Sequence, residues 1–250
     1  MSFSSSKRNR GVNSKQSSRK DNKRQANLYI VSDDTPSVPP RNNFKPVQPK
    51  NYIQGVYLEA IKQNDIVFAK GPAGTGKTFI PAKYASEELF FKRINKIVIT
   101  RPNVEAGQSL GFLPGELEEK FAPYLRPFED VFRKDFGDSF YEYLLKTKQI
   151  EAIPIGFMRG MTLEDCVVLV DESQNVDSKC LELIVSRIGN NCKMIFSGDT
   201  KQKDIEGESG LEDAIKTLQG IEGIEVVEFR VEDCVRSKMC RRIISAYADK

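Results

Sequence analysis

Short apolar runs recur along the chain, and the segments between them carry apolar residues at a helical spacing. A short continuous apolar run is typical of a buried strand, whereas apolar residues three and four positions apart are typical of a helix. The predicted strands are Ile66–Ala69, Lys96–Thr100, Cys166–Val170, Lys193–Ser197 and Gly223–Phe229. The predicted helices are Tyr52–Gln63, Lys77–Phe91, Asp177–Ile188, Gly210–Gln219 and Ser237–Tyr247. Strands that alternate with helices predict an α/β fold, in which helices flank a parallel sheet.

A long insertion, residues 103–165, precedes the third of these strands. Its predicted elements are helices over Leu117–Phe136 broken at Pro123 and Pro127, a helix over Phe140–Lys146, a strand over Ile150–Ile155 and a glycine-flanked loop that carries Arg159. The segment is too long for a simple crossover between neighbouring strands. Long segments outside a core are often lids or binding surfaces.

A glycine-rich segment follows the first predicted strand directly. It reads Gly71-Pro72-Ala73-Gly74-Thr75-Gly76-Lys77-Thr78, which has the spacing GxxxxGK[ST] of a phosphate-binding loop. Glycines let consecutive backbone N–H groups turn around phosphate oxygens, and the start of the next helix adds positive potential. We expect Lys77 to reach the β- and γ-phosphates of ATP and the Thr78 hydroxyl to bind Mg²⁺. The alternative is a glycine-rich turn that matches by accident, and the preceding strand argues against it.

The predicted strand Cys166–Val170 ends in the acidic pair Asp171 and Glu172. ATP hydrolysis needs such a pair at the end of a buried strand. Asp171 would hold the Mg²⁺ shell, and Glu172 would polarise the attacking water as general base. A solvated acidic turn is the alternative for any Asp-Glu pair, but the phosphate-binding loop upstream favours catalysis.

Other strand ends carry polar residues as well. Asp199 and Gln202 follow the strand Lys193–Ser197, and Arg101 follows the strand Lys96–Thr100. In open α/β sheets, ligands bind outside the carboxyl ends of the strands, so these side chains are expected near the γ-phosphate. In the sequence, the predicted strand Lys96–Thr100 lies between the phosphate-loop strand and the strand that ends in Asp171. Glu172 follows Asp171, the predicted metal ligand, directly. This order resembles that of the RecA-like P-loop NTPases rather than that of small GTPases or nucleoside kinases.

Gln54 lies on the predicted helix before the phosphate-loop strand. Its amide presents a donor and an acceptor side by side and could therefore hydrogen-bond the edge of an adenine. The alternative is a surface glutamine on a helix, which the local sequence favours.

Charge is divided unevenly along the chain. Residues 1–50 contain 11 Lys/Arg and 3 Asp/Glu, whereas the remaining 200 residues contain 27 Lys/Arg and 32 Asp/Glu. Residues 1–50 are also poor in apolar residues, which predicts a disordered basic tail before an ATPase domain over residues 51–250. Such a tail would either keep the protein soluble or bind RNA or DNA phosphates without sequence preference.

Composition excludes several kinds of chemistry. The chain has no histidine, which rules out Ser-His and Cys-His catalysis and any histidine-ligated metal. Its five cysteines form no CxxC pair, so we expect free thiols in a reducing compartment, the cytoplasm. No apolar stretch approaches 18 residues, so we expect no membrane span.

Longer blocks of sequence make the chain similar to the PhoH family, phosphate-starvation-inducible ATPases related to superfamily 1 helicases. Beside GPAGTGKT these blocks are TRPNVEAGQSLGFLPGELEEKFAPYLRP (100–127), IPIGFMRGMTL (153–163), VDESQN (170–175), SRIG (186–189), SGDTKQ (197–202) and VEDCVRS (231–237). The resemblance runs from about Gln54 to Tyr247. It implies one RecA-like ATPase domain, action on RNA and hexameric rings. The short chain and its GDTKQ segment are similar to phage-encoded members.

The resemblance also implies residue roles. By similarity to superfamily 1 helicases, Gln54 looks like the adenine-contacting glutamine. Gln174, Asp199 and Gln202 look like sensors of the γ-phosphate that couple hydrolysis to movement.

A single RecA-like domain leaves the source of a catalytic arginine open. Helicases of superfamily 1 close ATP between two such domains, and the second domain donates arginines. We therefore expect a homo-oligomer in which a neighbouring subunit supplies one, with Arg236, Arg159 and Arg101 as candidates. Each of these is equally suited to a local salt bridge or a substrate contact.

The predicted function is Mg²⁺-dependent ATP hydrolysis coupled to action on a nucleic acid, single-stranded RNA ahead of DNA, as in a helicase or translocase. One rival is a small-molecule kinase, whose ATP turnover would depend on a metabolite. Another is an ATP-driven module that remodels a partner protein. A degenerate nucleotide binder is a third, and the intact Lys77, Thr78, Asp171 and Glu172 argue against it.

Overall fold

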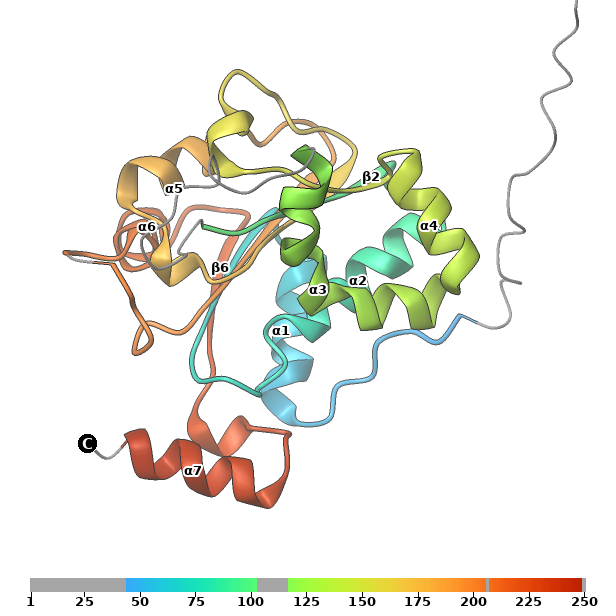
Figure 1. Cartoon of the computed structure of the whole chain (residues 1–250). Coiled ribbons are helices and arrows are strands. Elements are labelled where there is room, and N and C mark those ends of the chain that lie inside the picture. Colours follow the sequence, from blue (N-terminus) through green and yellow to red (C-terminus); the bar gives the residue numbers. More distant parts are fainter. Residues whose placement is uncertain (1–43, 103–116, 206, 249–250) are drawn as a thin grey trace, which may run out of the picture. The chain divides into compact units, whose positions relative to one another are not determined.

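The computed structural model of the chain describes residues 44–102, 117–205 and 207–248 (Figure 1). The predicted disorder of residues 1–43 and the segment 103–116 of the insertion lie outside the described residues.

Six parallel strands form one sheet in the order β3-β2-β4-β5-β1-β6. The strands are β1 (Ile66–Lys70), β2 (Lys96–Thr100), β3 (Ile150–Ala152), β4 (Cys166–Val170), β5 (Cys192–Gly198) and β6 (Ile224–Glu228). The predicted parallel sheet is therefore confirmed. β5 lies between β1, which leads into the glycine-rich loop, and β4, which leads into the acidic pair. The ends of all three strands consequently meet at one edge of the sheet, as the RecA-like arrangement requires.

Helices cover both faces of the sheet. The helices of the described residues are α1 (Tyr52–Gln63), α2 (Phe79–Phe90), α3 (Leu117–Phe136), α4 (Asp138–Lys146), α5 (Ser178–Val185), α6 (Gly210–Leu218) and α7 (Lys238–Ala248), of which α7 lies away from the sheet (Figure 1). In Figure 1, α1, α2, α3 and α4 lie on one side of the strands, and α5 and α6 on the other. Asp177 caps α5 as predicted, because its carboxylate accepts a hydrogen bond from the Cys180 N–H.

Alternate residues of each central strand face opposite cores. Along β4, Val167 and Leu169 join the core under α1 to α4, whereas Cys166, Val168 and Val170 join the core under α5 and α6. Since both faces are buried, the strand carries apolar residues continuously rather than at every second position. This burial explains why β4 could be recognised from sequence.

The insertion differs from its prediction in two places. α3 is one continuous helix through Pro123 and Pro127, not two helices broken there. Proline removes a helical hydrogen bond and bends the axis, and the ribbon of α3 does bend part-way along (Figure 1). The rings of Phe128 and Phe132 are fully buried, and this packing offsets the lost hydrogen bonding. Secondly, β3 ends at Ala152, and the expected glycine-flanked loop begins with a 3₁₀ turn over Ile155–Met158.

The domain begins earlier than the predicted boundary at residue 51. Phe44 and Val47, which were assigned to the tail, are buried in the core under α1 to α4. The Phe44 ring lies 4.7 Å from that of Phe90, and the ammonium of Lys83 lies 4.7 Å from the Phe44 ring centroid. Residues 44–50 are therefore part of the folded unit.

Replacement of Phe44 by alanine should lower the free energy of unfolding by about 3 kcal/mol, because it removes a buried ring and leaves a cavity. Urea unfolding of the full chain measures this value. Tyr52→Ala is the matched control, since Tyr52 is 86% exposed and its loss should change stability by less than about 0.5 kcal/mol. If the two substitutions changed the free energy of unfolding equally, residues 44–50 would not belong to the folded unit.

All five cysteines are free thiols, in agreement with the sequence. Cys166 and Cys192 lie opposite each other on β4 and β5, with their sulfurs 3.7 Å apart. Among the described residues, no helix is both long and apolar enough to cross a membrane.

Candidate active site

A cavity of about 470 Å³ opens at the carboxyl ends of β1, β4 and β5. It brings together most of the residues singled out from the sequence. Those that line it are Ala73, Gly74, Gly76, Lys77, Thr78, Arg101, Asp171, Glu172, Asp199, Gln202 and Arg236. Phe79, Pro127, Val131, Ser197, Gly198 and Val235 complete the lining, and the sequence assigned none of them a role at the site.

The Lys77 ammonium lies inside the curve of the glycine-rich loop. It donates hydrogen bonds to the carbonyl oxygens of Gly71 and Pro72, each at 2.6 Å. Burial lowers the pKa of Lys77 to about 8, although the carboxylates of Asp199, Asp171 and Glu172 oppose this shift. A buried cation that donates its hydrogen bonds to neutral carbonyls is suited to an anionic ligand, because a phosphate can replace those carbonyls as a charged acceptor.

Two glycines of the loop are required by close contacts. Gly71 has φ +138°, and a Cβ there would lie 2.3 Å from the carbonyl oxygen of Phe229. Gly76 has φ +97°, and a Cβ there would lie 2.7 Å from Nε2 of Gln54. Positive φ values are open to glycine at little cost, so both positions hold the loop in its phosphate-binding shape.

Gln54 supports the loop from behind. Its side chain is 2% exposed and does not line the cavity. Nε2 donates to the Thr75 carbonyl at 2.8 Å, and Oε1 accepts from the Lys50 N–H at 2.8 Å. The predicted contact of Gln54 with adenine therefore does not fit its position, and the surface-glutamine alternative is wrong as well.

Three loop residues predicted to bind the nucleotide do not line this cavity. Gly71 and Pro72 line a neighbouring cavity of about 740 Å³ between the end of β6 and α7, and their carbonyls hold Lys77. Thr75 is fully buried, with its hydroxyl donating to the Pro72 carbonyl at 3.0 Å.

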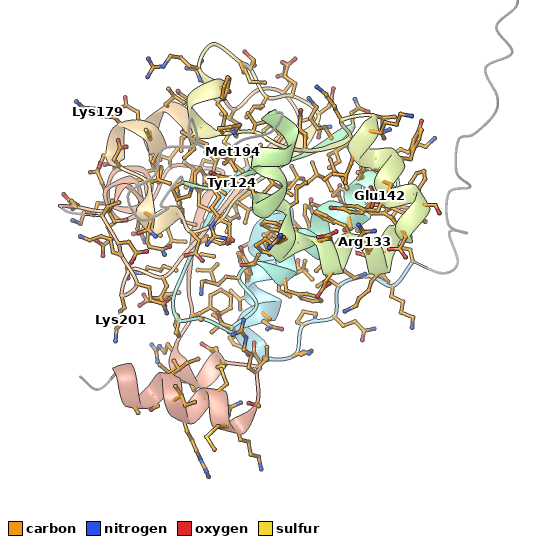
Figure 2. All side chains as sticks on the ribbon, viewed as in Figure 1. Tyr124, Arg133, Glu142, Lys179, Met194 and Lys201 are labelled. Carbon is orange, nitrogen blue, oxygen red and sulfur yellow. The ribbon has the colours of Figure 1, made fainter. Side chains whose placement is uncertain are left out.

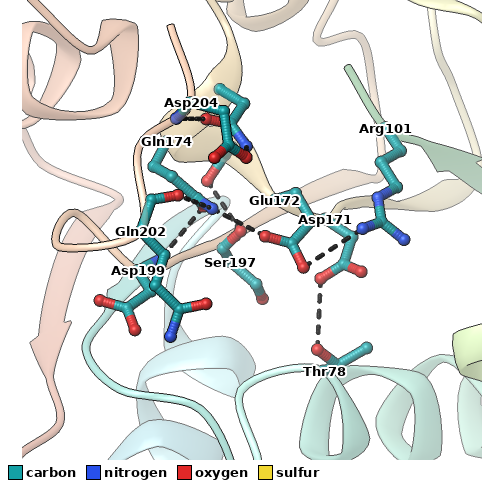
Figure 3. Close-up of polar contacts among 11 residues, drawn as sticks. Thr78, Arg101, Asp171, Glu172, Gln174, Ser197, Asp199, Gln202 and Asp204 are labelled. Atoms are coloured by element: carbon teal, nitrogen blue, oxygen red, sulfur yellow. Dashed lines mark hydrogen bonds and ion pairs between the residues drawn. The ribbon is translucent and has the colours of Figure 1, made fainter. Parts of the chain in front are cut away.

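Thr78 and Asp171 meet directly across the cavity (Figure 3). The Thr78 hydroxyl donates to Oδ1 of Asp171 at 3.2 Å, although 93 residues separate them in sequence. Burial raises the pKa of Asp171 above its usual range, and the neighbouring Glu172 adds to this effect, whereas Arg101 opposes it. A divalent cation bound between the two oxygens would supply the positive charge that the buried carboxylate lacks.

Glu172 is held in a strained backbone conformation that presents its carboxylate to the cavity. Its φ of 50° and ψ of 38° are left-handed, which is uncommon for a residue other than glycine. Arg101 lies 3.3 Å from Oε1, and Nε2 of Gln174 donates to Oε2 at 2.7 Å (Figure 3). Strain of this kind is often stored at functional sites, and here it leaves the carboxylate oriented by two donors.

Gln174 connects the acidic pair to the loop after β5. Its Nε2 donates both to Glu172 and, at 3.2 Å, to the carbonyl of Gln202. Its Oε1 accepts the Asp199 N–H at 3.0 Å. One buried amide therefore connects the 199–202 loop to the Glu172 carboxylate.

Supporting residues that sequence reasoning missed converge on the carbonyl of Lys77. The hydroxyl of Tyr57 donates to it at 3.2 Å, and that of Ser197 at 3.0 Å. Ser173 in turn donates to the carbonyl of Ser197 at 2.9 Å. These contacts join α1, β5 and the acidic turn to the start of α2. Only Ser197, which precedes Gly198-Asp199 at a strand end, carried a signal in the sequence.

The arginine candidates separate clearly. Arg101 and Arg236 line the cavity of their own chain, and the Arg236 stem packs closely against Gly74. Arg159 is exposed at the end of the 3₁₀ turn and does not line the cavity. The site therefore contains two arginines without a neighbouring subunit, which removes the main argument for an arginine supplied in trans.

Comparison with known proteins identifies the family. A family model described as PhoH-like protein matches residues 46–248, which include every described residue that lines the cavity. The chain belongs to the PhoH family. Protein PhoH of Escherichia coli (strain K12) is 42% identical over 207 residues, covering 81% of this chain and 58% of that protein. A PhoH-like protein of Bacillus subtilis (strain 168) is 43% identical over 205 residues, covering 81% and 64%. The chain thus spans less than two thirds of the length of these PhoH relatives.

Solved structures with a similar arrangement are distant. The large terminase of a thermophilic bacteriophage has a TM-score of 0.42 at 9% identity, covering 80% of this chain and 50% of that one. The SWI2/SNF2 ATPase core of Sulfolobus solfataricus has a TM-score of 0.40 at 12% identity, covering 75% and 47%. At these TM-scores the likeness adds nothing to the strand order.

In this PhoH-family site, Gln174→Ala should lower kcat for ATP hydrolysis by about tenfold with little change in KM. The substitution leaves Glu172 without its shorter hydrogen bond and the Asp199 N–H without an acceptor. Stability should fall by about 1–3 kcal/mol for the same reason. Steady-state kinetics and urea unfolding measure the two effects, with the exposed Gln219→Ala as matched control. A rise in KM at constant kcat would contradict the positioning role.

Proposed function

We propose that this chain hydrolyses ATP to ADP and phosphate at the cavity. One observation carries the proposal. Lys77, Thr78, the acidic pair Asp171 and Glu172, and the 199–202 loop are brought together at one polar cavity although they come from distant parts of the chain. These are the types of group that phosphoryl transfer to water requires, and membership of a family with the P-loop ATPase fold supports the same conclusion.

Mg²⁺ fits the residues present. Thr78 and Asp171 offer a hydroxyl and a carboxylate oxygen 3.2 Å apart, and Mg²⁺ prefers oxygen ligands from one or two protein groups together with substrate phosphates. Within the described ranges, no group of three or more acidic or cysteine side chains could form a complete metal cage. These two residues would hold the ion, which supplies positive charge to the β- and γ-phosphates when bound.

Glu172 is the proposed general base. Its carboxylate accepts the proton of the attacking water, while Gln174 and Arg101 keep it oriented. Lys77 and Arg236, which line the same cavity, neutralise charge on the transferred phosphoryl group. The chain's own side chains therefore account for binding, water activation and charge stabilisation.

Action on a single-stranded nucleic acid is the second part of the proposal, with RNA ahead of DNA. The loop that Gln174 contacts also carries Lys201, which is exposed and extends away from the sheet (Figure 2). A lysine there can bind phosphate while the Asp199 and Gln202 backbone, which Gln174 contacts, follows the state of the nucleotide. The basic composition of residues 1–50 supports the same class of partner. We also propose that the chain forms a homo-oligomer, with a hexamer as the expected size. This part of the proposal rests on the family resemblance.

Steady-state phosphate release with and without single-stranded RNA, and with single-stranded DNA in parallel, tests the polymer. Stimulation of several-fold by RNA, absent in the Glu172→Gln variant, is the expected result. Hydrolysis that neither polymer changes would remove the nucleic-acid part. In that case a metabolite or a protein partner would have to stimulate turnover, as the kinase and remodelling alternatives require.

A further inference from the structure

Phe79 is an exposed aromatic ring on the wall of the cavity. It is the first residue of α2, directly after Thr78, and 47% of its surface is accessible. The next residues of the helix, Ile80 and Ala82, are buried in the core. Among the described residues that line the cavity, Phe79 supplies the single aromatic side chain. An exposed ring inside a binding cavity costs hydration free energy that a stacked ligand would recover.

The cavity has both charged and apolar lining residues. Arg101 and Glu172 are paired in Figure 3, and Asp171 precedes Glu172 directly, so the terminal phosphate must lie at these residues, beside the general base. The apolar lining residues are Ala73 from the glycine-rich loop, Phe79 from α2, Pro127 and Val131 from α3, and Val235 from the segment before α7. The nucleoside is attached at the opposite end of the triphosphate from the γ-phosphate. It therefore lies away from the general base, and the apolar lining residues are the ones suited to contact it.

The position of Phe79 on α2 indicates which part of the bound nucleotide lies beside it. Backbone N–H groups at the start of a helix bind phosphate, and those of the first turn of α2 lie next to the loop. A side chain at the first helical position therefore begins beside the innermost phosphate, to which the ribose is joined. Gln54, the residue expected to contact the base, faces the loop from behind and leaves this place free.

We infer that Phe79 is the platform on which the base of the bound nucleotide stacks. This inference rests on the proposed nucleotide site and adds the subsite for the nucleoside. Stacking uses the face of the base, which all bases share, so the subsite recognises an aromatic base rather than a pattern of hydrogen bonds at its edge.

The affinities of the full chain for ADP and for inorganic pyrophosphate, measured by calorimetry, test the platform. Phe79→Ala should weaken ADP binding by about tenfold, the loss expected for one base–aromatic stack, and leave pyrophosphate within about twofold. Phe79→Tyr should keep the affinity for ADP, because a ring remains. Phe157→Ala is the matched control, since Phe157 is 58% exposed and lies outside the cavity, and it should change neither affinity.

Equal weakening of both ligands in Phe79→Ala would overturn the inference, because it would show damage to the phosphate loop. Unchanged ADP affinity in Phe79→Ala would overturn it as well, and the proposed hydrolysis would stand. A wild-type chain that binds neither ADP nor pyrophosphate would overturn the proposed function together with the inference.

Discussion

Glu172→Gln should reduce kcat for ATP hydrolysis by about 10²–10⁴-fold, the contribution typical of a positioned general base, and leave ATP binding intact. Glutamine has the shape of glutamate, and its amide oxygen can accept the hydrogen bond that Gln174 now donates at 2.7 Å. The variant therefore keeps the shape of the side chain and the hydrogen bond from Gln174, and it loses the group that accepts the proton together with the charge that pairs with Arg101. Phosphate release under steady-state conditions gives kcat, and calorimetry with a non-hydrolysable ATP analogue gives affinity.

Glu182→Gln is the matched control for this experiment, because Glu182 lies on α5 and does not line the cavity. Its kcat should equal that of the wild type. If Glu172→Gln kept more than about a third of wild-type kcat, another group would have to be the base, and the assignment of Glu172 would fail.

Lys77→Ala should weaken ATP and ADP binding by about 10²–10³-fold. The substitution removes a buried cation, and loss of one partner from a hydrogen-bonded charge pair costs about 2–5 kcal/mol. The carbonyls of Gly71 and Pro72 also lose their donor, so circular dichroism must first show that the variant is folded. Nucleotide affinity from calorimetry is the measurement.

Lys62→Ala provides the comparison for this variant, because Lys62 lies at the end of α1 and pairs with Glu59 at the surface. It should bind nucleotide as the wild type does. A folded Lys77→Ala variant with wild-type affinity would mean that nucleotide binds elsewhere, and the cavity at the ends of β1, β4 and β5 would lose its proposed ligand.

The sequence predicted those elements whose burial leaves a local pattern. β4 was recognisable because all five of its side chains are buried, and α1 because its buried residues follow a helical spacing. α3 was mispredicted because proline was taken as a break, whereas packing of Phe128 and Phe132 keeps the helix continuous through a bend. Tertiary packing decided that case, and it leaves no signal at the prolines themselves.

In the candidate site too, the features with a local sequence pattern were predicted, and those that depend on tertiary packing were not. The loop and the acidic pair are contiguous in sequence, and their chemistry follows from residue type and spacing. The role of Gln54 depends on the direction in which its side chain points, which the sequence does not specify. In the structure it points at the glycine-rich loop and hydrogen-bonds the Thr75 carbonyl. Phe79 carried no motif of its own, because its importance comes from exposure at the cavity wall beside α3.

Arg101 and Arg236 show a further limit of reasoning from a single chain. The sequence placed them among candidates for an arginine donated by a neighbour, because one RecA-like domain was expected to leave the site open. In the structure, both arginines line the same cavity of one chain. Formation of a homo-oligomer stays a prediction, and it no longer follows from the need for an arginine.

Phosphate release from ATP by the wild-type chain, with Mg²⁺ and again with EDTA, tests the central claim most directly. Parallel assays of Glu172→Gln and Lys77→Ala establish that this cavity is responsible. The account predicts turnover that requires Mg²⁺ and is lost in both variants. Turnover that persists in both variants, or a wild-type chain that releases no phosphate with Mg²⁺ either alone or with RNA or DNA, would contradict it.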